Sequence, residues 1–214
     1  MNISVILNSV IDLLSVFLLA LGIKGLSKVR SARDANRLAA IAMLLAVVGI
    51  LVNSLGNGGI SFNSWLWILF GSLLGGSLGL ITAQRVPMTA MPETVALFNG
   101  CGGMSSLLVA IGVAIFKDPL ANENINTGLV ELISIVVSVF VGAITFTGSI
   151  VAMAKLQGWL STPSWTQSKA RHFFNILCAV IALIGGIYLS IDGQNSLFLI
   201  VIASSLLGIG VTLP

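Results

Sequence analysis

Seven long apolar runs follow one another along this chain, and they constrain its fold more than any other feature. A helix needs about 20 apolar residues to cross the hydrocarbon core of a bilayer. The runs are continuous rather than alternating, which favours helices over the strands of a β-barrel. We therefore predict an all-α polytopic bundle that forms one transmembrane domain over residues 1–214. The expected helices cover residues 3–23, 38–54, 64–83, 92–116, 129–155, 172–190 and 196–213.

The charge content supports the same fold class. Charged residues make up 8% of the chain and its mean hydropathy is +1.07, whereas a soluble domain typically carries about 25% charged residues. A water-exposed globule of this composition would lack the polar side chains to cover its core. The net charge of +3 comes from few basic residues between the apolar runs, so it does not indicate nucleic-acid binding. The partner that the composition predicts is the lipid bilayer.

The Lys and Arg residues are distributed unevenly between the two sides of the expected bundle. Nine of the ten lie in alternate gaps between the runs, and cytoplasmic loops are enriched in Lys and Arg. This pattern predicts an N-terminus outside and a C-terminus in the cytoplasm. No positive charge precedes the first run, so we expect a retained anchor rather than a cleaved signal peptide. The nine residues are Lys24, Lys28, Arg30, Arg33, Arg37, Arg85, Lys155, Lys169 and Arg171.

Polar side chains inside the runs are costly in lipid and therefore informative. Asp12, midway through the first run, is either a hydrogen-bonded packing residue or part of a pore or relay. Glu131 lies near the outer end of the fifth run, where interfacial water and a helix N-terminus favour it. His172 is the single histidine, and we expect a structural role for it at the cytoplasmic start of the sixth run. Cys101 and Cys178 lie in separate runs and fit buried thiols better than a disulfide or metal site.

Small residues predict close helix packing in two of the runs. In the third run they recur at every fourth position, which leaves one smooth face. These residues are Gly71, Gly75 and Gly79. In the fourth run, Asn99 is followed by Gly100 and Gly103. A buried carboxamide needs hydrogen-bond partners, and the neighbouring glycines leave room for water or for a close helix.

A second polar patch lies in the fifth run at Thr145, Thr147, Gly148 and Ser149. Together with Asn99, this patch can line a hydrated path or can reflect ordinary packing between helices, and the residues alone leave both open. No Gly-rich loop has the third Gly and the preceding strand of a nucleotide site. We find no nucleophile–base pair either, so we predict no catalytic, cofactor-binding or metal-binding residues in this chain.

Two longer motifs resemble a known family. Met88-Thr89-Ala90-Met91-Pro92-Glu93, followed by Val95-Ala96-Leu97-Phe98-Asn99-Gly100, is similar to the signature helix of the proton-translocating NAD(P) transhydrogenase beta subunit. Thr145-Phe146-Thr147-Gly148-Ser149-Ile150-Val151-Ala152 agrees with a second motif of that family. Shorter stretches that also fit are residues 25–28, 155–158 and 212–214. The resemblance covers nearly the whole chain in order.

The resemblance implies a function that the composition alone does not predict. Members of this family transfer hydride from NADH to NADP+. They couple this reaction to inward proton movement across the bacterial cytoplasmic (inner) membrane or the mitochondrial inner membrane. Their alpha part binds NAD(H), and their beta part continues from membrane helices into an NADP(H) domain. They work as dimers of alpha–beta units. The implied partners of this chain are therefore the alpha subunit and the remainder of beta.

The same resemblance implies that this chain is a truncated portion of the beta membrane domain in the bacterial inner membrane. It lacks the last helices and the NADP(H) domain of the family after Pro214. It would then bind no cofactor itself and would not be catalytic alone. A small ion or solute transporter unrelated to nucleotides, with Asp12 and Asn99 as ligands, is the alternative. An inert scaffold is a third possibility.

The resemblance also implies roles for particular residues. Asn99 matches a proton-path position that is histidine in some members. Because asparagine does not titrate, an alpha-subunit helix would supply the ionisable group. Gly148 and Ser149 match small and hydroxyl positions linked to the proton route and to helix packing, and Thr145 opens the same motif. Asp12 departs from the apolar or aromatic residue expected at its position.

Overall fold

The computed structural model of this chain describes residues 3–26, 31–56, 61–116, 125–162, 169–192 and 195–213. Within these ranges the chain forms seven α-helices and one short 3-10 helix, and no strand. The prediction of an all-α fold with about seven helices is therefore confirmed. Lys28, Arg30 and Pro214 of the sequence analysis lie outside the described residues.

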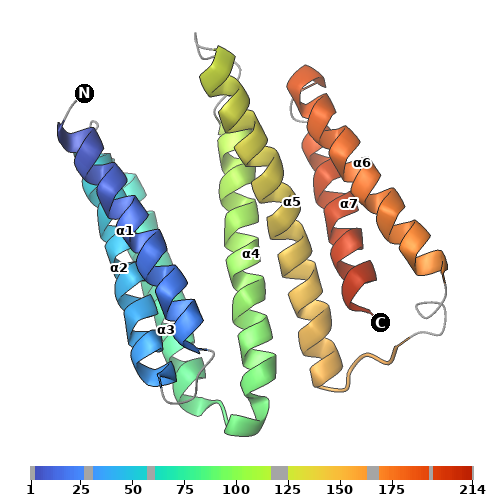
Figure 1. Ribbon diagram of the computed structural model, residues 1–214, viewed down its shortest axis with the longest axis horizontal. Coiled ribbons are helices and arrows are strands. Elements are labelled where there is room, and N and C mark those ends of the chain that lie inside the picture. The colour runs from blue at the N-terminus through green and yellow to red at the C-terminus, as the bar shows by residue number, and fades with distance from the viewer. Residues whose placement is uncertain are drawn as a thin grey trace. The chain divides into compact units, whose positions relative to one another are not determined.

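The helices follow the apolar runs and extend beyond some of them (Figure 1). The second begins at Ala32 rather than at residue 38, because Asp34 and Arg37 form a polar first turn ahead of the apolar segment. Their side chains pair at 3.8 Å, and an acidic residue in a first turn interacts favourably with the helix dipole. The elements are α1 (Ile3–Leu26), α2 (Ala32–Gly56), α3 (Phe62–Arg85), η1 (Met88–Ala90), α4 (Met91–Phe116), α5 (Ile125–Leu156), α6 (Ala170–Asp192) and α7 (Asn195–Thr212).

The surfaces of these helices are suited to lipid. Among the described residues, five helices are long and apolar enough to cross a membrane, and α7 adds a shorter apolar helix. Leucine, isoleucine, valine and phenylalanine side chains are exposed along most of the helices. Water would not tolerate apolar surface of this extent, whereas the hydrocarbon core of a bilayer solvates it. The chain is an integral membrane protein with a transmembrane helix fold.

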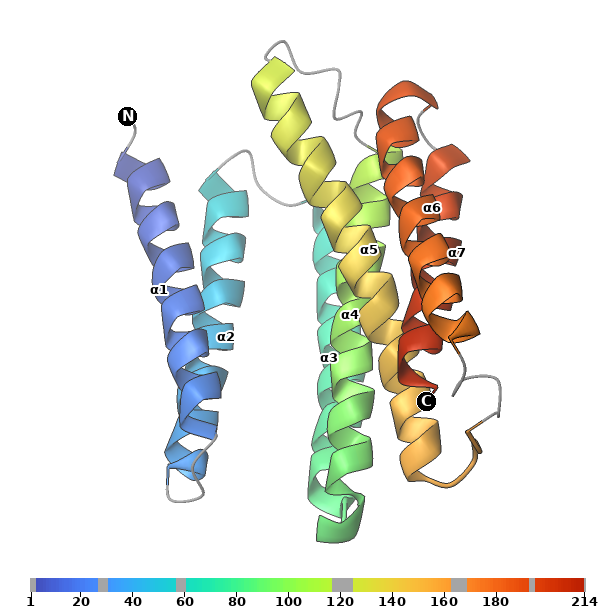
Figure 2. The ribbon, with the colours of Figure 1, turned by 45° about the vertical axis from the view of Figure 1, so that its right-hand side comes forward.

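The chain divides into two compact units, Met1–Ile81 and Thr82–Pro214. In the first unit, α1 and α2 form an antiparallel hairpin (Figure 2). A Cβ added at Gly25 would lie 2.7 Å from the Cβ of Ala35, and one at Gly22 would lie 3.0 Å from that of Ala39. Small residues on both helices therefore permit this close approach. Ser31 links the two ends, because its hydroxyl donates to the Gly25 carbonyl at 2.8 Å.

The third helix, α3, begins at a side-chain cap. The Ser64 N–H donates to the Ser61 hydroxyl at 3.2 Å, which satisfies one of the free backbone donors at a helix start. No residue of α3 is buried within the described structure. A Cβ added at Gly71, Gly75 or Gly79 would have no described atom within 4 Å. The packing role of these three glycines therefore remains a prediction.

In the second unit, α4, α5, α7 and α6 lie side by side in that order (Figure 1). The longest helix, α5, contacts both α4 and α7, so it is the central element of the unit. Val139 of α5 and Ile200 of α7 are fully buried. The other members of the core are Leu107, Ala110, Leu132, Ile135, Ala143, Leu189 and Leu197.

The contact between α5 and α7 is close and partly polar. A Cβ added at Gly208 would lie 2.7 Å from the Ile144 carbonyl oxygen and would also touch the Thr147 hydroxyl. That hydroxyl lies 2.8 Å from the carbonyl of Ala143 in its own helix and 3.1 Å from the carbonyl of Ser205 in α7. Thr147 therefore contributes one of the hydrogen bonds that join these helices.

Replacing Thr147 with valine is expected to weaken this contact. The Thr147→Val side chain keeps its volume but loses the hydroxyl that reaches the Ser205 carbonyl. Hydrogen bonds between membrane helices contribute about 0.6 kcal/mol on average and up to ~1.7 kcal/mol. We expect the free energy of unfolding in detergent to fall by about 0.5–1.5 kcal/mol. Thr94→Val is the matched control, because the Thr94 hydroxyl donates to Ala90 near the start of its own helix; an equal loss in both variants would contradict the prediction.

Candidate functional site

Helices α4 and α5 touch backbone to backbone. A Cβ added at Gly103 would lie 2.8 Å from the backbone nitrogen of Phe146, and one at Gly142 would lie 2.8 Å from the Gly103 carbonyl oxygen. A larger side chain at either position would separate the helices, so glycine permits the contact. Nearer the start of α4, a Cβ added at Gly100 would lie 3.2 Å from the Cβ of Ser149. The structure thus places Gly100 and Gly103 at this interface.

The close approach brings two polar side chains together. The Asn99 Nδ2 group donates to the Ser149 hydroxyl oxygen at 2.8 Å. Ser149 is buried, with 8% of its surface exposed, whereas Asn99 is exposed at the surface of its unit. Lipid cannot satisfy the remaining polar groups of a carboxamide. The open side of Asn99 is therefore a position for water or for a polar group of another helix.

The other two residues predicted for the proton path point in different directions. Thr145 lies one turn from Ser149 on the same face of α5, and its Cβ would lie 2.8 Å from a Cβ added at Gly103. Gly148 faces α7 instead, where an added Cβ would lie 3.1 Å from the Thr212 methyl carbon. The structure therefore groups Asn99, Ser149 and Thr145 at the α4–α5 contact, with Gly148 at the α5–α7 contact.

A row of polar and small residues continues along the face of α5 that meets α4. Successive members are three or four positions apart, which places them on one side of a helix. We call this row the α5 polar stripe, and it consists of Glu131, Ser134, Ser138, Gly142, Thr145 and Ser149. At about 1.5 Å per residue the stripe extends over about 27 Å. This length is close to the ~30 Å thickness of a hydrocarbon core.

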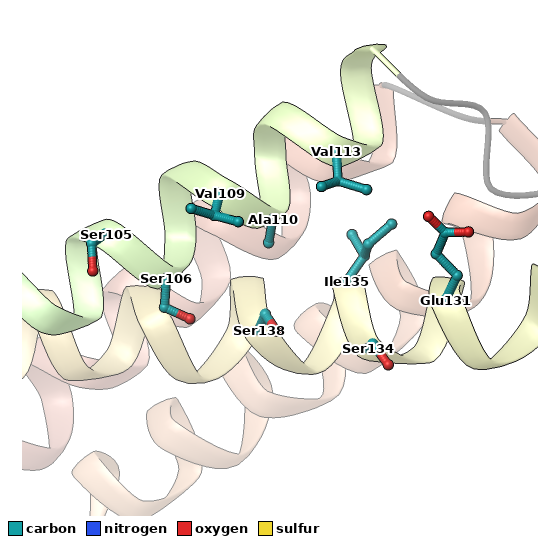
Figure 3. Close-up of a pocket in the computed structure, with 9 residues that line it drawn as sticks. All are labelled: Ser105, Ser106, Val109, Ala110, Val113, Glu131, Ser134, Ile135 and Ser138. Atoms are coloured by element: carbon teal, nitrogen blue, oxygen red, sulfur yellow. The ribbon is translucent and has the colours of Figure 1, made fainter. Parts of the chain in front are cut away.

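The end of the stripe away from Ser149 opens into a groove between α4 and α5 (Figure 3). Its volume is about 390 Å³, which is room for several water molecules at about 30 Å³ each. Apolar side chains of Val109, Val113 and Ile135 form part of the lining. The polar lining consists of Ser105 and Ser106 from α4 and of Glu131, Ser134 and Ser138 from α5.

Two of the groove hydroxyls are held by their own helices. Ser105 donates to the Gly102 carbonyl at 2.8 Å, and Ser134 donates to the Val130 carbonyl at 2.7 Å. Each hydroxyl oxygen retains lone pairs that can accept hydrogen bonds. With the Glu131 carboxylate, these oxygens give the groove the chemistry to hold water or a hydrated proton.

The four groove serines were not predicted from the sequence. Ser134 and Ser138 stand at helical spacing from Thr145 and Ser149, and this periodicity was the signal that could have identified them. Glu131 was interpreted only as an interfacial residue, whereas the structure places it in the lining of the groove. The serines of α4 could not be identified in this way, because which of them faces α5 depends on how the two helices pack.

Other candidate residues lie away from the α4–α5 face. The described residues contain no group of three or more His, Cys, Asp or Glu placed to hold a metal ion. Cys101 is exposed and Cys178 is buried, and both are free thiols. The His172 Nε2 atom lies 3.4 Å from the Arg171 guanidinium at an exposed position. Asp12 lies on the α1–α2 hairpin in the first unit.

Comparison with known proteins identifies the family to which this chain belongs. The family model described as NAD(P) transhydrogenase beta subunit matches residues 8–214. The chain belongs to the NAD(P) transhydrogenase beta subunit family. Two relatives named NAD(P) transhydrogenase subunit beta, from Rhodospirillum rubrum and from one of its strains, are each 36% identical over 149 residues. The match covers 68% of this chain and 30% of each relative, so the chain spans less than a third of their length.

Membership in the beta-subunit family confirms the resemblance drawn from the two sequence motifs. In this beta-subunit chain the first motif supplies Asn99 and Gly100 of α4, and the second supplies Thr145 and Ser149 of α5. The two motifs therefore meet at one interface, and they are joined there by the bond between Asn99 and Ser149. The family membership does not favour a transporter unrelated to nucleotides.

Proposed function

We propose that this chain is a membrane-domain portion of a proton-translocating NAD(P) transhydrogenase, and that its α4–α5 face lines the proton path. The observation that carries this proposal is the α5 polar stripe, which faces α4 over about the thickness of a hydrocarbon core. In the assembled enzyme, inward proton movement along this face is coupled to hydride transfer from NADH to NADP+.

On this proposal, the nucleotides bind elsewhere in the assembly. The alpha subunit holds NAD(H), and the part of beta outside residues 1–214 holds NADP(H). The chain acts within a dimer of alpha–beta units in the bacterial cytoplasmic membrane. Its own contribution to catalysis is the proton route, and it does not transfer hydride alone.

The basic residues suggest the direction of the path. Arg85 stands at the end of α3 just before α4, and Lys155 stands in the last turn of α5. By the positive-inside rule these ends lie in the cytoplasm, with the N-terminus outside. The groove at Glu131 then opens toward the outside, and the Asn99–Ser149 pair lies nearer the cytoplasm. A proton moving inward then meets the groove first and the Asn99–Ser149 pair second.

Asn99 and Ser149 have distinct tasks in such a path. Water and hydroxyl groups pass a proton along hydrogen bonds, whereas a bare charge in lipid is costly. Ser149 accepts a hydrogen bond from Asn99, so its own hydroxyl proton can be donated to a neighbouring group. Asn99 does not titrate and instead orients water or a polar side chain at its exposed side. The ionisable partner at that position comes from an alpha-subunit helix.

Filling the groove provides the direct test. We expect Ser138→Leu to reduce proton-coupled transhydrogenation in membrane vesicles of the assembled enzyme by at least about tenfold, equivalent to ~1.4 kcal/mol of barrier. A leucine at this position displaces water from the groove, whereas Ser138→Ala leaves the space open and is the matched control. Hydride transfer and proton movement would be followed together, the latter with a pH-sensitive dye. Normal proton movement in Ser138→Leu vesicles, with intact assembly, would rule out the groove as the entrance.

A further inference from the structure

The C-terminal end of α5 carries a cation that the proposed proton path does not use. Lys155 stands in the last turn of α5 (Ile125–Leu156) and is half-buried. Its Nζ atom donates to the Leu213 carbonyl oxygen at the end of α7, at 2.9 Å. Figure 1 shows the end of α7 beside the last turns of α5. A charged side chain therefore joins two helix ends that are 58 positions apart in the sequence.

Lys155 lies where two helix ends favour positive charge. A Cβ added at Gly208 of α7 would lie 2.7 Å from the Ile144 carbonyl oxygen of α5. Four positions further along both helices, one added at Gly148 would lie 3.1 Å from the Thr212 methyl carbon. The two helices therefore run parallel, and their C-terminal ends, which carry partial negative charge, lie together. Lys155 offsets this charge and satisfies one of the carbonyl groups that lack a partner at a helix end.

No acidic side chain of α5, α6 or α7 stands near this lysine. The sequence has no Asp or Glu between Glu131 and Asp192, and α7 has none. Glu131 precedes Lys155 by 24 positions, which is about 36 Å along α5. Asp192 stands at the end of α6 from which the chain passes to the start of α7. On these helices, no side-chain ion pair competes with the bond to the Leu213 carbonyl.

The bond between Lys155 and α7 lies close to the Asn99–Ser149 pair. Lys155 follows Gly148 by seven positions, or about two helical turns, so both residues face α7. Ser149 comes directly after Gly148 and points about 100° away, where its hydroxyl accepts the hydrogen bond from Asn99. Packing of Thr212 against Gly148 limits the rotation of α5 about its axis. The direction of the Ser149 hydroxyl therefore depends on how closely the end of α7 is held.

We propose that Lys155 is a positioning residue of the proton path, which holds the last turn of α7 against α5 and so keeps Ser149 directed at Asn99. The proposal rests on the proposed function, because Lys155 acts on the path only through this pair. Lys155 itself carries no proton along the path. Without its bond to the Leu213 carbonyl, the end of α7 moves away from α5, and α5 is free to turn.

Removing the cation in the assembled enzyme tests this role. We expect Lys155→Met to reduce the coupled rate in membrane vesicles by about tenfold, equivalent to ~1.4 kcal/mol of barrier. Lys155→Arg should keep most of the rate, because a guanidinium also donates to a carbonyl. In a chain that already carries Asn99→Leu, Lys155→Met should lower the rate by less than about twofold, since substitutions that act through one pair are not additive.

A second lysine provides the matched control. Lys169 is exposed just before α6 (Ala170–Asp192), and Lys169→Met removes the same charge from the same region of the sequence. We expect Lys169→Met to keep the full coupled rate. A tenfold loss from Lys155→Met that is equally large with and without Asn99→Leu would overturn the proposal, because Lys155 would then act independently of the pair.

A distance measurement separates positioning from a general loss of structure. Spin labels on non-natural amino acids at the exposed Gln157 and Val211 would report the spacing of the ends of α5 and α7. We expect one narrow distance distribution in the wild type and in Lys155→Arg, and a broader one in Lys155→Met. If Ser138→Leu stops proton movement while Lys155→Met changes neither the rate nor the distances, the role of Lys155 is wrong and the proposed path remains.

Discussion

Replacing Asn99 with leucine is expected to reduce proton-coupled transhydrogenation in the assembled enzyme by about 100-fold, the effect typical of removing one positioned donor from a water-poor site. Leucine is close to asparagine in size, so the packing of α4 changes little. What the Asn99→Leu chain loses is the hydrogen bond to Ser149 at 2.8 Å and the polar group on the exposed side of Asn99. The measurement is hydride transfer and proton movement in membrane vesicles that contain all subunits.

Two further variants separate a role in the path from a role in packing. Asn99→His retains hydrogen-bonding groups at this position, and we expect it to keep most of the coupled rate. Ser149→Ala removes the acceptor of the same hydrogen bond. The effects of substituting both partners of one bond are not additive. The double variant Asn99→Leu/Ser149→Ala should therefore have a coupled rate only slightly below that of Asn99→Leu alone. A complex that assembles normally and keeps its full rate with Asn99→Leu would identify the chain as a scaffold.

The second large effect is expected at the glycine contact between α4 and α5. Gly103→Ala should lower the free energy of unfolding in detergent by about 1–3 kcal/mol, the usual cost of an overfilled core. The added Cβ would lie 2.8 Å from the Phe146 nitrogen and 2.9 Å from the Gly142 carbonyl oxygen. These are backbone atoms, which cannot turn aside as a side chain would, so the helices must separate. The Asn99–Ser149 bond would lengthen with them.

The neighbouring glycine provides the matched control. A Cβ added at Gly102 has no described atom within 4 Å, and alanine is intrinsically the better helix former by about 1 kcal/mol. Gly102→Ala is therefore expected to leave stability unchanged or to raise it slightly. Equal stabilities for Gly103→Ala and Gly102→Ala would mean that α4 and α5 do not meet as the structure describes.

The number of helices could be predicted from the sequence because each apolar run is long enough to form a helix of several turns, and five of the described helices are long and apolar enough to cross a bilayer. The start of α2 was less predictable, since Asp34 and Arg37 extend the helix into a polar region where the apolar signal ends. The small residues at Gly100 and Gly103 indicated a close approach in α4, and a Cβ added at either position would lie within 3.2 Å of an atom of α5. The glycines of α3 were an equally strong signal, yet no described residue packs on them. A smooth helix face predicts that another helix packs there, but it does not identify which helix.

The sequence by itself determines the membrane-spanning fold class and the two family motifs, since both depend on local residue content and order. Only the tertiary structure decides that Asn99 donates to Ser149, that Thr147 and Gly148 face α7, and that four serines and Glu131 share a groove. Consecutive residues of an α-helix point about 100° apart. Thr147, Gly148 and Ser149 are adjacent in the motif, but the packing of α5 between α4 and α7 assigns them to different neighbours.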